Sequence, residues 1–240
     1  MHTRFAYHTI SVTGRRSKNE DAWGAHWYDE TLFCAVADGI GGLPAGDVAA
    51  SCAVWTAEEV VTRAFAPGGK PDYPDLLREA HARADDAVKK AATGLQQGMG
   101  TTLTTALFRD GQLTTCNTGD SRCSVVRDGH LIQVTRDHSL VQEQIDAGLI
   151  SPKDAFAHPQ KHIVTRSIGD LFAADVTEIP IVPGDIVILS TDGMHDYLTP
   201  EVIAREVEGK SARLAAASLL TAAAPVSGDN ITICVVTVSR

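Results

Sequence analysis

The chain has 240 residues, of which 44% are hydrophobic and 21% are charged, and its formal net charge is −9. This apolar content supports one sizeable core and excludes a disordered chain. The negative charge argues against nucleic acid as a main ligand, and the longest apolar stretch, 214–224, is too short to cross a bilayer. We therefore expect a single domain, residues 1–240, that binds neither nucleic acid nor a membrane.

The five cysteines are an odd number and form no paired Cys-x-x-Cys motif. Because most of them lie in apolar runs, we expect buried free thiols in a reducing compartment. Residues 1–14 contain no continuous apolar segment, so no signal peptide is predicted. These features favour a cytoplasmic protein.

Helical periodicity is visible in five segments, namely 45–65, 74–93, 140–147, 200–207 and 211–223. Thr199 followed by Pro200 is typical of a helix start, with the threonine as N-cap. Two strand pairs are separated by Asp-Gly turns, 103–108 with 113–117 and 123–126 with 131–134. An Asp-Gly pair between alternating segments favours a tight hairpin, so neighbouring strands should be antiparallel.

The helices come in pairs separated by blocks of hairpins, which differs from the regular strand–helix alternation of a parallel sheet. The expected fold class is α+β, with antiparallel sheets covered by helices. Residues 146–162 are rich in turn formers and are expected to form a mobile flap, and residues 67–71 a surface loop between helices.

Four apolar runs carry an aspartate at one end, followed by a small or turn-forming residue. Asp38 and Asp192 end two runs that read as buried strands, Asp120 follows a third, and Asp229 opens the last. Carboxylates gathered at strand ends repel one another unless a cation lies between them. Oxygen-only ligands select magnesium, manganese or calcium, so the pattern predicts a site for more than one hard metal ion.

Two such ions could activate a shared water and hold a phosphoryl oxygen for in-line attack. Asp38 is the natural bridging ligand, and Gly39 lets its backbone carbonyl approach the metal without a side chain in the way. Gly41 and Gly42 would keep the entrance open. A phosphate also needs a planar cation, for which Arg16 is the first candidate and Arg15 and Lys18 compete on spacing alone.

Eight short motifs follow one another along most of the chain. They are Arg16 to Asp21, Ala37-Asp38-Gly39-Ile40-Gly41-Gly42, Gly100-Thr101-Thr102, Gly119-Asp120-Ser121-Arg122, Asp137-His138-Ser139, Thr165 to Asp170, Ser190-Thr191-Asp192-Gly193 and Asp229-Asn230. In these motifs and their order, the chain resembles the metal-dependent serine/threonine phosphatases of type 2C, in their short, stand-alone bacterial form. The resemblance implies a four-layer αββα sandwich, with two packed antiparallel sheets between helix pairs and the metals at one end.

The resemblance also implies roles for individual residues. Two core Mn²⁺ or Mg²⁺ ions would be held by Asp38, the carbonyl of Gly39, Asp192 and Asp229. A third ion would be held by Asp120, which shares it with Asp192, and Asp196 matches a further acidic position for it. The remaining roles are Glu20 and Asp21 acting through metal-bound water, Arg16 holding the substrate phosphate, and Asn230 orienting the ligand loop.

Two positions depart from the family pattern. Some members have a histidine directly after the metal-binding Asp-Gly, where this chain has Ile40. The identity of the general acid is therefore open, and a metal-bound water is the expected substitute. The second position is His195, which follows closely after the metal-binding Asp192 and Gly193. A structural role and a catalytic role are equally expected for it.

Several neighbouring residues have simpler structural interpretations. Arg122 is expected to be a salt-bridge partner, His138 a buried hydrogen-bonding residue, and 98–102 a tight strand entry under the core. His158 and His162 in the flap are expected to be solvated. Cys116 and Arg122 have the Cys-x5-Arg spacing of cysteine-dependent phosphatases, but Asp120 between them would repel a phosphate.

The expected function is therefore hydrolysis of phosphoserine and phosphothreonine in cytoplasmic proteins by a metal-activated water. The resemblance implies phosphoprotein substrates, an opposing bacterial serine/threonine kinase and a monomeric enzyme. A type 2C fold that only binds a partner is the alternative. Degenerate members of that kind usually lack metal carboxylates, whereas every expected carboxylate is present here.

Overall fold

A computed structural model describes residues 3–41, 45–66, 69 and 71–240. Gly42 and most of the predicted surface loop at 67–71 lie outside the described residues. The described part folds into two five-stranded antiparallel sheets. One has the order β1 (Arg4–Val12), β10 (Ile231–Ser239), β9 (Ile186–Ser190), β6 (Arg122–Arg127) and β7 (His130–Gln133). The other has the order β2 (Asp21–Tyr28), β3 (Thr31–Asp38), β4 (Leu103–Arg109), β5 (Gln112–Thr118) and β8 (Asp175–Pro180).

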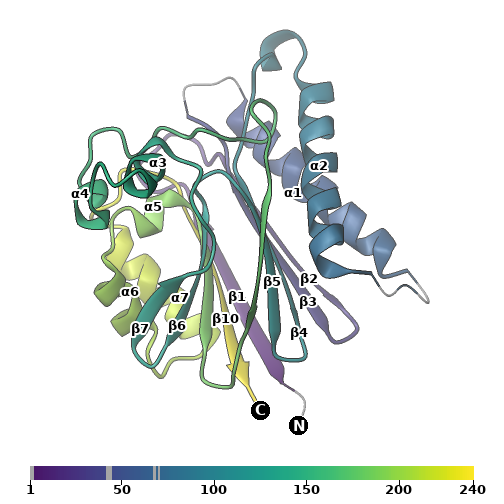
Figure 1. Ribbon diagram of the computed structural model, residues 1–240. Helices are drawn as coiled ribbons and strands as arrows, with labels where there is room; N and C mark the ends of the chain where they lie inside the picture. The colour runs from purple at the N-terminus through teal and green to yellow at the C-terminus, as the bar shows by residue number, and fades with distance from the viewer. Residues whose placement is uncertain (1–2, 42–44, 67–68, 70) are drawn as a thin grey trace.

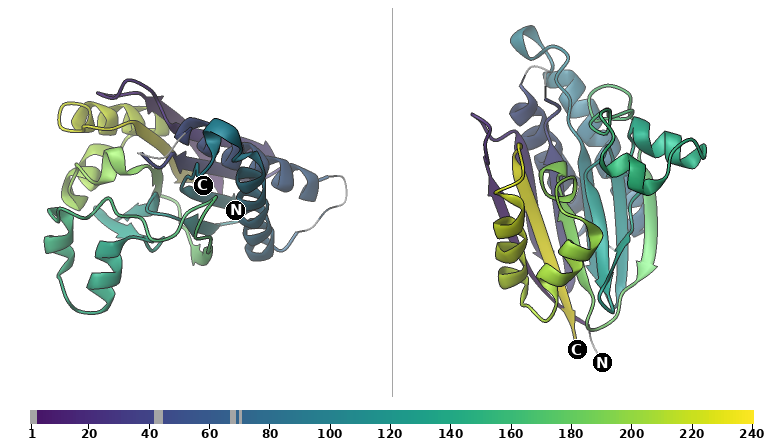
Figure 2. Two further views of the ribbon diagram at one scale, coloured as in Figure 1. Left: turned by 90° about the horizontal axis from the view of Figure 1, so that it is seen from above. Right: turned by 90° about the vertical axis from the view of Figure 1, so that its left-hand side faces the viewer.

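The two sheets pack against each other between two pairs of helices (Figures 1 and 2). The helices α1 (Gly46–Ala64) and α2 (Tyr73–Ala91) cover the sheet of β2–β5 and β8, and a short 3₁₀ turn, Gly94–Gln96, follows them. The helices α6 (Pro200–Val207) and α7 (Ala212–Ala223) cover the other sheet. A third apolar layer lies between the sheets and includes Phe108, Val187 and Val236. This arrangement confirms the predicted αββα sandwich.

Both predicted Asp-Gly hairpins are present. Asp110 and Gly111 have φ of 49° and 76°, and Asp128 and Gly129 have φ of 50° and 76°. Positive φ at both central residues is the requirement of the type I′ turn, whose twist suits antiparallel strands. The pairs β4–β5 and β6–β7 are accordingly antiparallel.

The predicted helices are confirmed with small shifts at their ends. The helix predicted at 200–207 has those bounds, and Thr199 occupies its N-cap position, although no side-chain cap hydrogen bond is present there. The segment predicted at 140–147 forms α3 (Leu140–Asp146). A very short helix, α5 (Asp192–His195), begins directly after β9 and was not predicted. No helix in the described ranges is both long and apolar enough to cross a bilayer.

The segment predicted as a flap, residues 146–162, contains a helix of its own. Helix α4 (Pro152–Phe156) begins with a capping box, in which Ser151 and Asp154 each accept a hydrogen bond from the other's backbone N–H. Helices α3 and α4 lie outside the sandwich, beside α5 (Figure 1). We keep the name flap for residues 146–162.

The strand registers decide where the chemistry lies. Val12 pairs with Ile231 at one end of β1 and β10, and Arg4 pairs with Ser239 at the other end, near both termini. The strands β3 and β9 end, and β2 and β10 begin, at the end of the sandwich away from the termini (Figure 1). Residues at these strand ends therefore meet although they are far apart in the sequence.

Candidate metal centre

Five aspartates that the sequence predicts as metal ligands meet at this end of the sandwich. Asp38 is the last residue of β3, and Asp21 opposite it is the first residue of β2. Asp192 begins α5, Asp229 precedes β10, and Asp120 follows β5. Burial, followed by repulsion from Asp192, Asp21 and the other two, raises the pKa of Asp38 well above its ordinary value. The five carboxylates therefore lie close enough for their charges to oppose one another.

The backbone of Asp38 is fixed by the segment that precedes β4. Its N–H donates to Thr102 Oγ1 at 2.8 Å, and its carbonyl accepts from Thr102 N–H at 2.9 Å and Thr101 Oγ1 at 2.8 Å. The N–H of Ile40 donates to the carbonyl of Gly100 at 3.0 Å. These bonds agree with the interpretation of the Gly-Thr-Thr motif as a tight strand entry. Its role is to hold Asp38 in place.

Two carboxylate oxygens of the cluster are buried without a hydrogen-bond partner, Asp21 Oδ1 and Asp192 Oδ1. The other oxygen of Asp21 accepts from Thr232 Oγ1 at 2.6 Å and Thr191 Oγ1 at 3.0 Å. Burial, opposed by these two bonds and assisted by repulsion from Asp192 and Asp229, raises the pKa of Asp21 to about 7. A buried anionic oxygen without a partner is costly. An all-oxygen donor set with two such oxygens fits a hard divalent ion.

Two glycines are required by close packing around the cluster. A Cβ on Gly39 would lie 2.4 Å from the backbone carbonyl carbon and oxygen of Gly46, the first residue of α1. A Cβ on Gly193 would lie 1.8 Å from the carbonyl oxygen of Asn230. Glycine at position 39 is therefore needed for the packing of α1 against the end of β3. This requirement adds to the predicted one, that the carbonyl of residue 39 can approach a metal. At Gly41 a Cβ would meet nothing within 4 Å, in keeping with an open entrance.

The loop before β2 is tied to the loop before β10 by Asn230. Its Nδ2 donates to the carbonyls of Thr13 and Lys18, both at 2.8 Å, and its Oδ1 accepts from Glu20 N–H at 2.9 Å. The carbonyl of Glu20 in turn accepts from Gly39 N–H at 3.1 Å. Asn230 thus joins the loop that carries Asp229 to the loop that carries Glu20, and Glu20 in turn is bonded to the residue after Asp38.

The three basic candidates for the phosphate differ in what they contact. Arg16 Nη2 lies 2.7 Å from Asp229 Oδ2, and its Nε donates to the carbonyl of Gly228 at 3.2 Å. Its side chain is half exposed. Arg15 instead donates to the carbonyl of Pro225, and Lys18 pairs with Asp47. Among the three, the structure brings Arg16 to a carboxylate of the cluster.

The side of the cluster toward α5 contains Asp120 and Asp196. Burial and then repulsion from Asp192 raise the pKa of each of them. Arg122 nearby donates to both oxygens of Asp137 at 2.6–3.0 Å. This bidentate pair confirms the interpretation of Arg122 as a salt-bridge residue.

Burial raises the pKa of Cys116 to about 12, so this thiol is not a nucleophile at neutral pH. Arg122 is bound to Asp137 and is not free to hold a phosphate. The Cys-x5-Arg spacing is therefore not the active-site loop of a cysteine-dependent phosphatase.

Two of the histidines near the cluster have structural partners. His138 accepts from Gly119 N–H at 3.1 Å through Nδ1, and its Nε2 lies 3.0 Å from Asp175 Oδ2. His195 is buried, with Nδ1 2.9 Å from Ser190 Oγ. Burial lowers the pKa of His195 well below its ordinary value, so its ring is neutral. Both contacts favour structural roles for these two residues.

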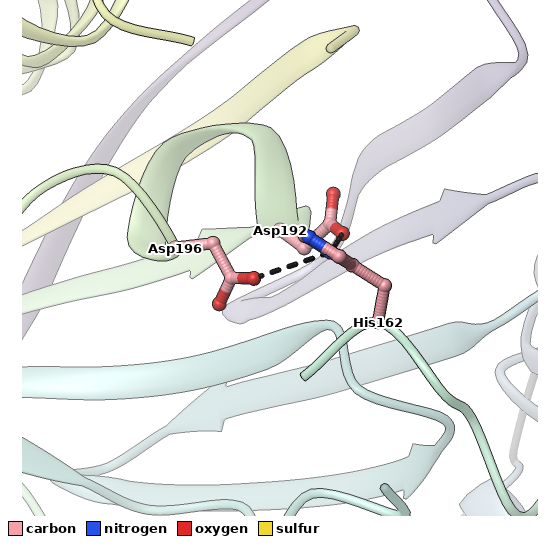
Figure 3. Close-up of side chains that lie close together, drawn as sticks. All are labelled: His162, Asp192 and Asp196. Carbon is pink, nitrogen blue, oxygen red and sulfur yellow. Dashed lines mark ion pairs between the residues drawn. The ribbon is translucent and has the colours of Figure 1, made fainter. Parts of the chain in front are cut away.

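His162 is the site residue that the sequence interpretation missed. Although half exposed, its Nδ1 lies 3.6 Å from Asp192 Oδ2 and 3.5 Å from Asp196 Oδ2 (Figure 3). Contact with Asp192 raises the pKa of His162. The preceding residue, Lys161, donates to the carbonyl of Asp196 at 2.9 Å. The sequence contains no local signal for this approach, because the flap and α5 meet only in the folded chain.

Comparison with known proteins identifies the family. A family model described as protein phosphatase 2C matches residues 11–223. The chain is 34% identical to the serine/threonine protein phosphatase PstP of Mycobacterium tuberculosis over 92% of its own length, and it spans only 42% of PstP. It is 30% identical to the protein phosphatase PhpP of Streptococcus pneumoniae, and the match covers 96% of each chain.

A solved structure extends the likeness to three dimensions. The catalytic domain of the serine/threonine protein phosphatase PstP, in complex with two manganese ions, superimposes with a TM-score of 0.85 at 28% identity, covering 99% of this chain and 100% of that one. The matched family model and these relatives agree with the order of the sequence motifs. The chain belongs to the protein phosphatase 2C family.

Proposed function

We propose that this chain hydrolyses phosphoserine and phosphothreonine in proteins, as a single catalytic domain with two Mn²⁺ or Mg²⁺ ions at the aspartate cluster. The observation that carries this proposal is the pair of buried, unpartnered oxygens on Asp21 and Asp192 within a set of mutually repelling carboxylates. The manganese ions of the PstP catalytic domain support the choice of metal.

The core ions would be held by Asp38, the carbonyl of Gly39, Asp192 and Asp229. Asp38 would offer its carboxylate from a fixed position, because its backbone N–H and carbonyl are held by Thr102 and Thr101. The other acidic residues would complete the centre. Glu20 and Asp21 would act through bound water, and Asp120 with Asp196 would serve an additional ion shared with Asp192.

When bound, such ions lower the pKa of a water and neutralise charge on the phosphoryl oxygens. The chain's own contribution is to hold the phosphate and to order the carboxylates. Arg16 is held in place by its ion pair with Asp229, and its side chain is half exposed. Its remaining N–H groups can donate to two phosphate oxygens. Asn230 orders the loop that carries Arg16. Ile40 has no proton to give, so the leaving alcohol takes its proton from water.

The substrates we propose are phosphoproteins modified by a bacterial serine/threonine kinase, with the enzyme acting as a monomer in the cytoplasm. Free thiols at all five cysteines support a reducing compartment. The flap is the element that would shape substrate choice. It borders a cavity of about 790 Å³ between α3, α4 and β6–β7, whose wall includes Asp120 and Asp196.

The test is hydrolysis of a phosphothreonine peptide and of an aryl phosphate by the purified chain with Mn²⁺. We expect activity that EDTA removes and that Asp38→Asn lowers by about a thousandfold or more, since the substitution removes a carboxylate charge that would hold the ions. Asp110→Asn in the β4–β5 turn is the matched control and should keep full activity. Absence of metal-dependent turnover in the wild-type chain would favour the alternative of a binding module.

Arg16→Ala should raise KM by about tenfold and change kcat less, because a phosphate clamp acts on the bound substrate as well as on the transition state. Arg15→Ala, whose guanidinium contacts Pro225, is the neighbouring control. A fall in kcat with unchanged KM would restrict Arg16 to transition-state stabilisation.

A further inference from the structure

Strand β2 is an edge strand that begins at the metal centre. It pairs with β3 on one side, and in the described ranges no strand pairs with its other side. Its first residue is Asp21, so it runs from the catalytic end of the sandwich toward the β2–β3 turn (Figure 1). An edge strand presents a row of N–H and C=O groups to which an extended chain can add as a further strand. Here that row leads directly away from the aspartate cluster.

The hydrogen bonds of β2 show which of its residues face the open edge. The N–H of Asp21 donates to Asn19 Oδ1 at 3.3 Å, and the carbonyl of Ala25 accepts from the Tyr7 hydroxyl at 3.4 Å. Neither bond goes to β3, and backbone groups alternate between the two sides of a strand, so the odd-numbered residues direct theirs outward. Asn19 closes the row at its first residue, which leaves residues 23–27 open. The contact of Tyr7 is longer than the usual O–H···O range of about 2.5–3.0 Å, so an incoming N–H can replace it.

Two tryptophans project along this open stretch. Trp23 and Trp27 are 45% and 44% exposed, although they share a strand face with Ala25, which packs against the core between the sheets. Exposed aromatic side chains of this size are enriched in protein interfaces, where they contribute much of the binding energy. The residue opposite each of them on an added strand would lie about 4.5–5.5 Å away between Cβ atoms. The surface therefore fits an extended peptide with apolar residues at alternate positions.

The other edge strands each lack one of these features. Strand β7 has only four residues and β8 ends in Pro180, and short strands and prolines protect an edge from pairing. Strand β1 is long, but its exposed residues, Arg4 and Ala6, lie at the end away from the metal centre. Strand β2 contains neither lysine nor proline. Among the described edge strands, it combines an open row, exposed tryptophans and a start at the catalytic end.

We propose that the open edge of β2, residues 23–27, binds an extended segment of the phosphoprotein substrate as an additional antiparallel strand. The proposal rests on the proposed function. A segment that leaves this edge at Asp21 arrives at the metal centre and at the loop of Arg16, the residue proposed to hold the phosphate. This continuity favours the substrate over a partner that binds elsewhere on the molecule.

The direction of the added strand sets the direction of the substrate. An antiparallel segment has its C-terminal end beside Asp21, so the docked residues precede the phosphoresidue in the substrate sequence. Apolar residues at every second position would lie opposite Trp23, Ala25 and Trp27, and the residues between them would face the other side of the sheet. The edge thus selects unfolded segments of phosphoproteins, since only an extended chain can pair with a strand.

The first test uses the phosphopeptide Val-Lys-Val-Lys-Val-Gly-Gly-phosphothreonine-Ala, in which the lysines keep the alternating run soluble. Trp23→Thr and Trp27→Thr retain β-propensity and should each lower kcat/KM for this peptide by about threefold to tenfold. Hydrolysis of an aryl phosphate and the melting temperature should not change. Trp55→Ala is the matched control, because Trp55 is 63% exposed but belongs to α1. It should match the wild type on both substrates.

The peptide itself supplies a second control. With the Val-Lys-Val-Lys-Val run placed after the phosphothreonine, the tryptophan substitutions should have no effect on kcat/KM.

The second test removes single N–H groups from the peptide by N-methylation. The valine N–H groups would donate to β2, whereas the lysine N–H groups point away from it. A methyl group on the middle valine should lower kcat/KM by about threefold to tenfold, and one on a lysine should leave it unchanged. On the protein side, Ala25→Pro removes an outward N–H without removing a bond to β3, which an edge strand tolerates. It should give the same loss.

Three results would overturn the proposal. They are equal losses on the aryl phosphate, unchanged kcat/KM in the tryptophan variants, and equal effects of methyl groups on valine and lysine. Fluorescence anisotropy with the labelled, unphosphorylated peptide separates the docking edge from the proposed function. Binding that depends on Trp23 and Trp27 in a chain without metal-dependent turnover would refute the proposed function and keep the docking edge. Turnover of the aryl phosphate without such binding would do the reverse.

Discussion

The two walls of the metal centre are held in different ways. The strand wall, formed by Asp21 and Asp38, is fixed by backbone hydrogen bonds and by buried threonines from neighbouring strands. The flap wall, formed by Lys161 and His162, is held to α5 mainly by side-chain contacts at partly exposed positions. A wall bonded through the sheet ladder opens only with the whole fold, whereas a wall held by side chains can open locally. The strand wall therefore holds its carboxylates in fixed positions, whereas the flap wall can change its position at the edge of the site.

The largest effect is expected from Gly39→Ala in the strand wall. The new Cβ would lie 2.4 Å from backbone atoms of Gly46, which cannot move without shifting the start of α1. We expect a loss of about 1–3 kcal/mol in the free energy of unfolding and weaker Mn²⁺ binding, measured by denaturant titration and calorimetry.

Gly41→Ala is the control for this change. It lies two positions further along and a Cβ there meets nothing within 4 Å, so its stability should match the wild type. Equal stability of the two variants would show that the strand wall is softer than its hydrogen bonds indicate.

A pH-dependent effect is expected from His81 of α2, whose ring packs against β4 and β5. Its two ring nitrogens lie 3.1 Å and 3.0 Å from the hydroxyls of Thr118 and Thr105, and burial lowers its pKa to about 3. The unfolded chain, with an ordinary pKa of about 6.5, binds a proton below that pH while the folded chain does not. Stability should therefore fall as the pH drops from 6.5 toward 3.

The expected loss from His81 is about 2 kcal/mol between pH 7.5 and pH 5. His81→Gln can keep one of the hydroxyl bonds but has no titrating group, so the stability difference between these pH values should shrink by that amount. The measurement is the melting temperature at both pH values for both proteins. An unchanged difference would mean that His81 does not drive the pH dependence.

The smallest global effect is expected from Lys161→Ala in the flap wall. The Lys161–Asp196 pair joins the flap to α5 outside the two sheets, so its loss should open the flap locally and change the melting temperature little. The flap should nevertheless open more often, and hydrogen exchange at α4 should rise severalfold. Lys153→Ala, an exposed lysine of α4, should change neither. A large drop in melting temperature with Lys161→Ala would show that the two walls unfold together.

Much of this architecture was predictable because it depends on local rules. The Asp-Gly turns predicted two hairpins, since positive φ at both central residues is accommodated best by such pairs. The aspartates at the ends of apolar runs were predicted as one cluster, because strand ends in a packed sandwich share an edge. Arg122 and His138 were also interpreted correctly as structural residues.

Other features depend on contacts that no local pattern records. The need for glycine at position 39 comes from the start of α1, and the choice among three basic residues comes from where Asp229 lies. Residues 146–162 were expected to form a mobile flap, and the short helix α4 with its capping box was not predicted within it. His162 was expected to be solvated, and its ring lies against two carboxylates.

The amino-acid sequence by itself determined the order of strands, turns and helices and the acidic residues that end them, because each depends on neighbours within a few positions. Tertiary structure alone decided which groups touch at the site. Arg16 reaches Asp229, and His162 reaches Asp192 and Asp196, across long stretches of chain. Such contacts follow from how helices and loops pack on the sheets, and that packing is set by the whole core at once.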